Sequence, residues 1–141
     1  MLCEELMKQN VACLSRTDTA QIAAHLMEEH NVGFLPVCDA SRKVLGTLTD
    51  RDLAIRLVAR GLPTTTPVDE LMTKEVVACK PTDNVRHAEQ IMGQHRKSRI
   101  MCIDDADRLV GVISLSDIAQ HEGSTRTAAT LRQVTTREVQ V

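Results

Sequence analysis

Apolar residues recur along this chain at two spacings: every three to four residues in some stretches, and in short continuous runs in others. The wider spacing is clearest in residues 20–30, where Ile22, Ala23 and Met27 share one face of a helix. Gly33 follows that stretch, close to where a helix commonly ends. The same criteria predict helices at 20–30, 50–60, 84–95 and 115–121, preceded by a short helical turn at 4–7.

The short apolar runs predict strands. Residues 34–38 and 44–49 are two such runs, and the polar stretch 39–43 between them predicts a hairpin. The full set of predicted strands is 11–14, 34–38, 44–49, 76–79, 99–103 and 109–114.

The order of elements repeats with an offset of 65 residues. When residues 5–55 are compared with residues 70–120 without a gap, 13 of 51 positions are identical. A fixed period of this kind is the signature of a tandem duplication. Each copy is β-α-β-β-α, an α+β unit, and we expect two copies related by a pseudo-two-fold axis to form one globule. The predicted divisions are repeat 1 at 1–62, a linker at 63–67, repeat 2 at 68–122, and a tail at 123–141 in which 128–134 could form a short helix.

The strongest local motif lies near the end of each copy. Gly46-Thr47-Leu48-Thr49-Asp50-Arg51-Asp52 in the first copy matches Gly111-Val112-Ile113-Ser114-Leu115-Ser116-Asp117 in the second. Each run places a hydroxyl at a strand end and a carboxylate three residues later, at a strand-to-helix junction. The first N–H groups of a helix lack backbone partners, so such a junction can hold a phosphate or a sugar.

Composition narrows the classes of partner. The net charge of −2 gives no reason to expect nucleic acid or an anionic membrane. One Phe with no Trp or Tyr leaves no aromatic platforms for stacking bases, and predicts an aliphatic, Met-rich core. We expect no membrane span, because no run of about 18 apolar residues exists. We also expect no signal peptide, because the N-terminus has neither a basic region nor an apolar one.

The five cysteines include no C-x-x-C pair, which favours the reducing cytoplasm over a disulfide framework. Cys13, Cys38, Cys79 and Cys102 fall in predicted strands, so we expect small core residues there and expect Cys3 to be the most exposed.

Catalytic and metal-binding patterns are missing from the sequence. There is no Gly-rich phosphate loop with a lysine, no G-x-S-x-G and no H-E-x-x-H. His30 and His95 occupy the same repeat position at a helix end, with no carboxylate or thiol at ligand spacing. We therefore predict no enzyme activity, no catalytic cofactor and no metal site.

Both motif copies resemble the signature of cystathionine β-synthase (CBS) domains. The runs Leu35-Pro36-Val37, Leu26-Met27 and Ile91-Met92 are also typical of that family. A tandem pair of CBS domains is called a Bateman module, and the resemblance covers roughly residues 5–121. The chain is similar to a stand-alone bacterial-type CBS pair that carries no enzyme or transporter domain.

The resemblance implies a ligand site at each motif. The family's motif aspartate, matched by Asp52 and Asp117, accepts hydrogen bonds from both ribose hydroxyls, as the two oxygens of a carboxylate can. Thr49 and Ser114, with Ser116, would face the ribose or phosphate, and Arg51 and Arg99 are candidate phosphate contacts. The adenine would be bound by residues of the opposite repeat. For the Asp117 site these are Val11, Ala12, Val32, Gly33 and Phe34; for the Asp52 site they are Val76, Val77, Lys97, Ser98 and Arg99.

The function implied is that of a regulatory sensor for an adenosyl ligand. AMP, ADP, ATP, NAD and S-adenosylmethionine all stay open, as does the identity of the regulated protein. Ser116 stands where Arg51 is, so the two sites are not expected to be equivalent. We expect a homodimer formed through exposed apolar faces of the helices after Asp52 and Asp117. One alternative is a protein-interaction module without a nucleotide, in which the two aspartates serve only as acids at helix N-termini. Another is a nucleotide-hydrolysing enzyme, which would have to turn over its bound ligand.

Overall fold

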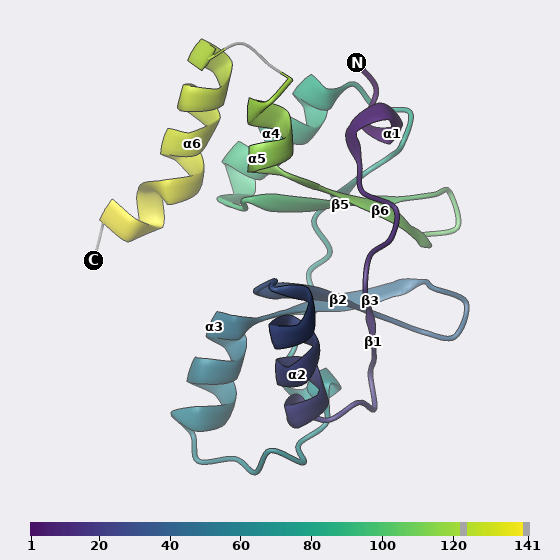
Figure 1. Ribbon diagram of the computed structural model, residues 1–141, viewed down its shortest axis with the longest axis vertical. Helices are drawn as coiled ribbons and strands as arrows, with labels where there is room; N and C mark the ends of the chain where they lie inside the picture. The colour runs from purple at the N-terminus through teal and green to yellow at the C-terminus, as the bar shows by residue number, and fades with distance from the viewer. Residues whose placement is uncertain (122–123, 140–141) are drawn as a thin grey trace. The chain divides into compact units, whose positions relative to one another are not determined.

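Two compact units make up the fold, and each contains one three-stranded sheet (Figure 1). The computed structural model describes residues 1–121 and 124–139, with the side chains of 128–135 among the latter. The repeat-1 unit consists of residues 12–76. The repeat-2 unit combines residues 1–11 with the chain from Val77 onward.

In the repeat-1 unit, strand β1 pairs in parallel with β2, and β2 pairs antiparallel with β3. Helix α2 begins after Thr19, whose side chain accepts from the Ile22 N–H, and ends at Asn31 in the left-handed region with φ 52°. The elements are β1 (Leu14–Ser15), α2 (Ala20–His30), β2 (Phe34–Cys38), β3 (Val44–Thr49), α3 (Asp50–Asp52), the π-helix η1 (Leu53–Val58) and the 3-10 helix η2 (Val68–Glu70).

The repeat-2 unit has the same sheet, with β4 parallel to β5 and β5 antiparallel to β6. Its N-terminal helix α1 lies against β6. The elements are α1 (Cys3–Leu6), β4 (Ala78–Cys79), α4 (Val85–His95), β5 (Arg99–Ile103), β6 (Leu109–Ser114), α5 (Leu115–Ala119) and α6 (Ser124–Val139).

The predicted α+β class is confirmed, and α2 and both hairpins have the predicted bounds. The first strand of each repeat is shorter than predicted: β1 begins at Leu14 rather than residue 11, and β4 at Ala78 rather than residue 76. These are edge strands that pair with a neighbour over two residues each. The predicted single helix at 50–60 is wrong, because its α-helical turn ends at Asp52 and gives way to wider turns, with the Ala59 N–H bonded to the Ala54 carbonyl at 2.9 Å.

The segment that leads into each repeat packs on the other repeat's sheet. Lys8 exchanges backbone hydrogen bonds with Val112 of β6, at 2.9 and 3.0 Å. The repeat gives the equivalent pair in the other unit: Thr73, equivalent to Lys8, exchanges two backbone hydrogen bonds of 2.9 Å with Thr47 of β3, which is equivalent to Val112. The leading segments are therefore exchanged between the two repeats, which is why residues 1–11 belong to the repeat-2 unit.

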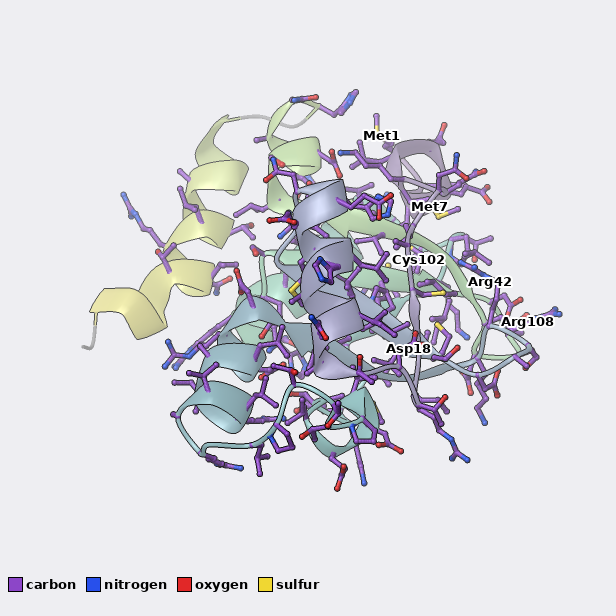
Figure 2. All side chains as sticks on the ribbon, turned by 60° about the horizontal axis from the view of Figure 1, so that its bottom comes forward. Met1, Met7, Asp18, Arg42, Cys102 and Arg108 are labelled. Carbon is purple, nitrogen blue, oxygen red and sulfur yellow. The ribbon has the colours of Figure 1, made fainter. Side chains whose placement is uncertain are left out.

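The exchange explains why the expectation for Cys3 was wrong. Cys3 is fully buried in the repeat-2 core, because α1 packs there and the Cys3 N–H donates to the Asp83 carbonyl at 2.8 Å. Figure 2 labels Met7 of the same segment and Cys102 of β5, which both pack in this core. Cys38, Cys79 and Cys102 are buried strand residues as predicted, whereas Cys13 is half-buried and precedes β1.

Helix α6 packs along α4 and α5 (Figure 1), and Val134 on it is buried. It is longer than the predicted 128–134 segment. The helix after Asp117 therefore does not present an exposed apolar face, since Leu115 and Ile118 are buried in the repeat-2 core. In the repeat-1 unit, by contrast, Ile22 and Val58 are exposed.

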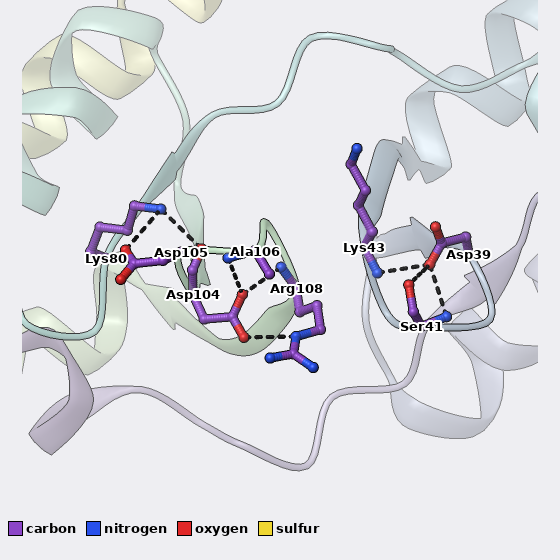
Figure 3. Close-up of polar contacts among 8 residues, drawn as sticks. All are labelled: Asp39, Ser41, Lys43, Lys80, Asp104, Asp105, Ala106 and Arg108. Atoms are coloured by element: carbon purple, nitrogen blue, oxygen red, sulfur yellow. Dashed lines mark hydrogen bonds and ion pairs between the residues drawn. The ribbon is translucent and has the colours of Figure 1, made fainter.

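The two hairpin turns are built around equivalent aspartates (Figure 3). One oxygen of Asp39 accepts from the Ser41 N–H and the Lys43 N–H, both at 2.9 Å, and from the Ser41 hydroxyl at 2.8 Å. Asp104 accepts from the N–H groups of Ala106 and Arg108, and its second oxygen pairs with the Arg108 guanidinium, all at 2.9 Å. The Ser41 hydroxyl and the turn N–H groups lower the pKa of Asp39, and the Arg108 N–H is the largest cause of the lowered pKa of Asp104.

We predict that these two carboxylates make the fold sensitive to acid. Their pKa values are lower in the folded chain than in the unfolded one, so they stabilise the fold above the unfolded value of about 4. That stability is lost as the pH falls through the folded-state pKa. The double variant Asp39→Asn/Asp104→Asn should show a smaller drop in melting temperature between pH 7 and pH 3 than the native chain.

Asp105→Asn is the matched control, since this carboxylate on the same turn pairs with Lys80 instead of with turn N–H groups. An equal drop in melting temperature for the native chain and the double variant would contradict the prediction.

Candidate functional site

The first junction is a reciprocal cap between Thr49 and Asp52. Thr49 is extended, with φ −114° and ψ 163°, and its hydroxyl accepts from the Asp52 N–H at 3.1 Å. In return, the Thr49 N–H donates to Oδ2 of Asp52 at 2.9 Å. This capping box satisfies two backbone donors where β3 turns into α3, so the hydroxyl and carboxylate of the motif have a structural role.

The second junction repeats this geometry between β6 and α5. The Ser114 hydroxyl accepts from the Asp117 N–H at 3.1 Å, and Asp117 Oδ2 accepts from the Ser114 N–H at 3.0 Å. Ser116, in the variable part of the motif, lies with its hydroxyl 2.9 Å from that of Ser114. The second junction therefore presents two adjoining hydroxyls.

The other oxygen of each aspartate faces a cation. Oδ1 of Asp52 lies 3.8 Å from Nε of Arg56, whose guanidinium also donates to the Leu71 carbonyl at 2.8 Å. Oδ1 of Asp117 lies 3.6 Å from Nζ of Lys8, a side chain that is 74% exposed. The carboxylate side chains themselves are only 15% and 14% exposed, so each is held in place while one oxygen is turned toward a cation.

The environment keeps Asp117 ionised. Burial acts to raise the pKa of Asp117, but the N–H and hydroxyl of Ser114 and the Lys8 ammonium together lower it below its usual value. A charged acceptor at this position can bind a hydroxyl donor more strongly than a neutral one.

The entry to the second strand of each repeat also reaches the junction of its own repeat. The Gly33 carbonyl accepts from the Asp50 N–H at 2.9 Å, and the Ser98 carbonyl accepts from the Leu115 N–H at 2.8 Å. A Cβ on Gly33 would lie 2.6 Å from Oδ2 of Asp50, so a larger residue there would require the Asp50 side chain to turn away.

The remaining predicted ligand residues occupy varied environments. Arg51, Val76, Lys97 and Ser98 are exposed, and the others are half-buried: Val11, Ala12, Val32, Phe34, Val77 and Arg99. The structure brings Thr49 together with Asp52, and Ser114 together with Ser116 and Asp117. The assignment of adenine contacts to the opposite repeat stays a prediction.

Sequence reasoning missed two of the residues at the junctions. Arg56 follows Asp52 by four residues on a predicted helix, so the usual spacing of helical ion pairs could have identified it. Lys8 reaches Asp117 only through the exchange of leading segments, and nothing in its local sequence signals that contact.

The residues that the structure describes show neither a cluster of metal ligands nor a membrane-spanning helix. Among the side chains of residues 1–121 and 128–135, no group of three or more His, Cys, Asp or Glu is placed to hold a metal ion. Within the described ranges, no helix is both long enough and apolar enough to cross a membrane.

Comparison with known proteins identifies close relatives. The CBS domain-containing protein YhcV of Bacillus subtilis is 39% identical over 125 residues, which cover 89% of this chain and 88% of YhcV. Hypoxic response protein 1 of Mycobacterium tuberculosis is 33% identical over 118 residues, covering 83% of this chain and 82% of that protein. A crystal structure of Hypoxic Response Protein I with two coordinated zinc ions matches with a TM-score of 0.80 at 31% identity, over 87% of this chain and all of that one.

Two further solved structures, too distant to show more than the fold, contain adenosyl compounds. CBSX2 in complex with AMP has a TM-score of 0.74 at 20% identity, over 84% of this chain and 93% of that one. The CBS domain pair of protein MJ0100 was solved in complex with 5′-methylthioadenosine and S-adenosyl-L-methionine. It has a TM-score of 0.76 at 24% identity, over 85% of this chain and 94% of that one.

A match to an enzyme is confined to a small part of it. Inosine-5′-monophosphate dehydrogenase of Methanocaldococcus jannaschii is 34% identical over 82% of this chain, but over only 22% of the enzyme. The model of the CBS domain matches here twice, at residues 3–59 and 68–123. This chain therefore belongs to the CBS domain family, as a tandem pair of CBS domains.

Proposed function

We propose that this chain is a non-catalytic regulatory module of the cytoplasm that binds an adenosine-containing ligand at its motif junctions. The observation that carries this proposal is the shared state of Asp52 and Asp117. Each carboxylate is fixed through Oδ2 by backbone, while Oδ1 forms an ion pair with an exposed or half-exposed cation. A ribose hydroxyl could take the place of that cation at Oδ1.

Displacing Lys8 from Asp117 costs little free energy. An ion pair between a carboxylate and a largely exposed lysine contributes only about 0–1 kcal/mol. A hydrogen bond from a ligand hydroxyl to a charged acceptor contributes roughly 1.5–3 kcal/mol. The displaced Lys8 ammonium would then lie beside the ligand, where it could pair with a phosphate. The complexes of CBSX2 with AMP and of MJ0100 with S-adenosyl-L-methionine support an adenosyl ligand as the general class.

The two junctions would present different side chains to a ligand. Lys8 stands where the other leading segment has Thr73, and Ser116 stands where the other motif has Arg51. A cation beside Asp117 favours an anionic phosphate over the cationic sulfonium of S-adenosylmethionine. We therefore propose that the Asp117 junction prefers AMP, ADP or ATP.

The test is a thermal melt of the protein against AMP, ADP, ATP, NAD and S-adenosylmethionine. A ligand present at about 100 times its dissociation constant should add roughly 2.7 kcal/mol and raise the midpoint by several degrees. Asp52→Asn and Asp117→Asn keep an oxygen to accept the backbone N–H of the cap but remove the charge. If the proposal holds, one compound shifts the native melt and one of these changes abolishes the shift.

Asp52→Ala and Asp117→Ala provide the comparison for stability. Each should destabilise the unliganded protein by about 1 kcal/mol, through loss of the hydrogen bond that the carboxylate accepts from the N–H of Thr49 or Ser114, whereas the asparagine changes should cost less. The absence of a shift with every compound, in a protein that melts cooperatively, would rule out the nucleotide function.

We further propose a homodimer formed through the repeat-1 unit. The exposed large apolar side chains on its helices or next to them are Ile22, Ile55, Val58 and Leu62, of which Val58 is 72% exposed. The equivalent helices of the repeat-2 unit are covered by α6. Val58→Glu should convert a dimer to a monomer in light scattering with its melting temperature nearly unchanged. The matched control is Val76→Glu, an exposed valine of the same unit outside these helices.

The second candidate function is a protein-interaction module without a small ligand. The exposed apolar side chains of α2 and η1 favour it, because they suit a protein partner as well as a second copy. The two candidates are separated by the aspartates: in an interaction module, Asp52→Asn and Asp117→Asn would alter stability alone.

A further inference from the structure

Three thiols from distant parts of the sequence meet in the core of the repeat-2 unit. Sγ of Cys79 lies 3.7 Å from Sγ of Cys3 and 3.5 Å from Sγ of Cys102. All three side chains are buried, at 0–3% exposure. Cys79 and Cys102 are directly paired residues on β4 and β5, and Cys3 arrives from α1.

We propose that Cys3, Cys79 and Cys102 form an oxidation site, in which hydrogen peroxide joins Cys3 to Cys79 through a disulfide. This inference does not depend on the proposed ligand.

The geometry favours Cys3 with Cys79 over the other contact. A disulfide needs its two Cβ atoms about 3.5–4.5 Å apart. Cys79 and Cys102 are paired in the hydrogen-bonded ladder between β4 and β5, which fixes the separation of their backbones, so a bond between them could form only as far as the sheet allows. Cys3 lies on a four-residue helix, and closing its 3.7 Å contact to a bond of 2.05 Å requires a movement of about 1.7 Å.

The environment also selects Cys3 as the attacking sulfur. The Cys79 thiol donates a hydrogen bond to Cys3, and the contacts of Cys3 with Cys102 and Cys79 lower the pKa of Cys3. The contacts of Cys79 with Cys102 and Cys3, together with burial, raise the pKa of Cys79. The thiolate is the reactive form toward peroxide. Peroxide would reach it when α1 opens, because a helix of only four residues has few backbone hydrogen bonds of its own to hold it closed.

The chemistry balances with one peroxide. The Cys3 thiolate attacks one peroxide oxygen, the O–O bond breaks, and Cys3 becomes a sulfenic acid as hydroxide leaves and is protonated to water. The Cys79 sulfur then attacks the Cys3 sulfur, the S–O bond breaks, and a second water leaves with the Cys79 proton. The two thiols supply two electrons, and Cys102 stays reduced.

The bond would fasten the exchanged leading segment to the second repeat. It closes the chain from residue 3 to residue 79, so it restricts the unfolded chain over a long loop. It would also hold Lys8, five residues beyond Cys3, beside Asp117.

The experiment treats the folded, fully reduced protein with hydrogen peroxide, blocks the remaining thiols with an alkylating reagent, and maps tryptic peptides. Trypsin places each of the five cysteines in a separate peptide, with Cys3 in 1–8, Cys79 in 75–86 and Cys102 in 100–108. We expect peptide 1–8 linked to peptide 75–86, lighter than their sum by two hydrogen atoms. The oxidised protein should melt at a higher temperature than the reduced one.

Alanine variants identify the roles. Cys102→Ala should still give the 1–8 to 75–86 link, and Cys3→Ala and Cys79→Ala should each abolish it. Cys38→Ala, which removes a buried cysteine of the repeat-1 unit, is the matched control and should keep the link. A melt of each variant shows that it is folded before treatment.

Three results would overturn the proposal. One is a link between 75–86 and 100–108 in place of the predicted pair. Another is conversion of Cys3 to a sulfinic acid without a link. The third is an unreacted Cys3 in the native protein after exposure that fully oxidises the same protein in denaturant.

Discussion

Leu71→Ala is expected to destabilise the repeat-1 unit by about 3 kcal/mol, although Leu71 belongs by sequence to the second repeat. The side chain is 1% exposed and packs in the core that contains Leu35 and Leu48. Truncation to alanine removes buried methyl groups and leaves a cavity between rigid strands. Urea denaturation gives the total loss of stability, and hydrogen exchange shows where it occurs. Amide protection should fall in β2 and β3.

The matched variant is Leu6→Ala, at the equivalent position of the other leading segment. Leu6 is only partly buried against the repeat-2 core, so a smaller loss is expected, and it should reduce protection in β5 and β6. A loss of protection in β5 and β6 for Leu71→Ala would show that the leading segments are not exchanged.

Gly46→Val is expected to cost about 3 kcal/mol, because the position has no space for a side chain. A Cβ there would lie 2.6 Å from the carbonyl oxygen of Thr73 and 2.9 Å from the sulfur of Met72. The carbonyl is backbone, held by the bridge between Thr73 and Thr47, so it cannot turn aside. The variant must weaken that bridge, and the midpoint of urea denaturation measures the cost.

Gly111→Val is the comparison, and it should be tolerated better. A Cβ at Gly111 would meet the Met7 side chain, with its sulfur at 2.6 Å. Methionine is flexible and can adopt another rotamer, so part of the clash is relieved. Equal losses for the two glycine variants would mean that the backbone of the leading segments yields as readily as a side chain.

Local chemistry was enough to predict much of each repeat. Helix α2 begins after Thr19 and ends at Asn31, and each of these positions has the residue type that its cap requires. The hairpins follow from apolar runs on either side of Asp39 and Asp104, whose carboxylates organise the turns. The motif hydroxyls and carboxylates were also correctly placed at strand-to-helix junctions.

The exchange of leading segments could not be predicted in the same way. The two segments share Glu-Leu-Met, at residues 5–7 and 70–72, so either could pack on either sheet. The choice depends on chain connections that no local pattern encodes. The burial of Cys3 and the contact of Lys8 with Asp117 both follow from that choice, so both were missed. Helix α6 was underestimated because its buried Thr130 and Val134 lie within a largely polar stretch.

The exchange also sets an order of events during synthesis. Residues 12–76 are continuous in sequence, so the repeat-1 unit is complete once that stretch has left the ribosome. Residues 1–11 must instead wait for β6, because Lys8 pairs with Val112. At ordinary elongation rates the wait for about a hundred residues lasts roughly 5 to 20 seconds. During that interval residues 1–11 have no sheet to join, so this segment is synthesised before the repeat-1 unit but completes its packing after it.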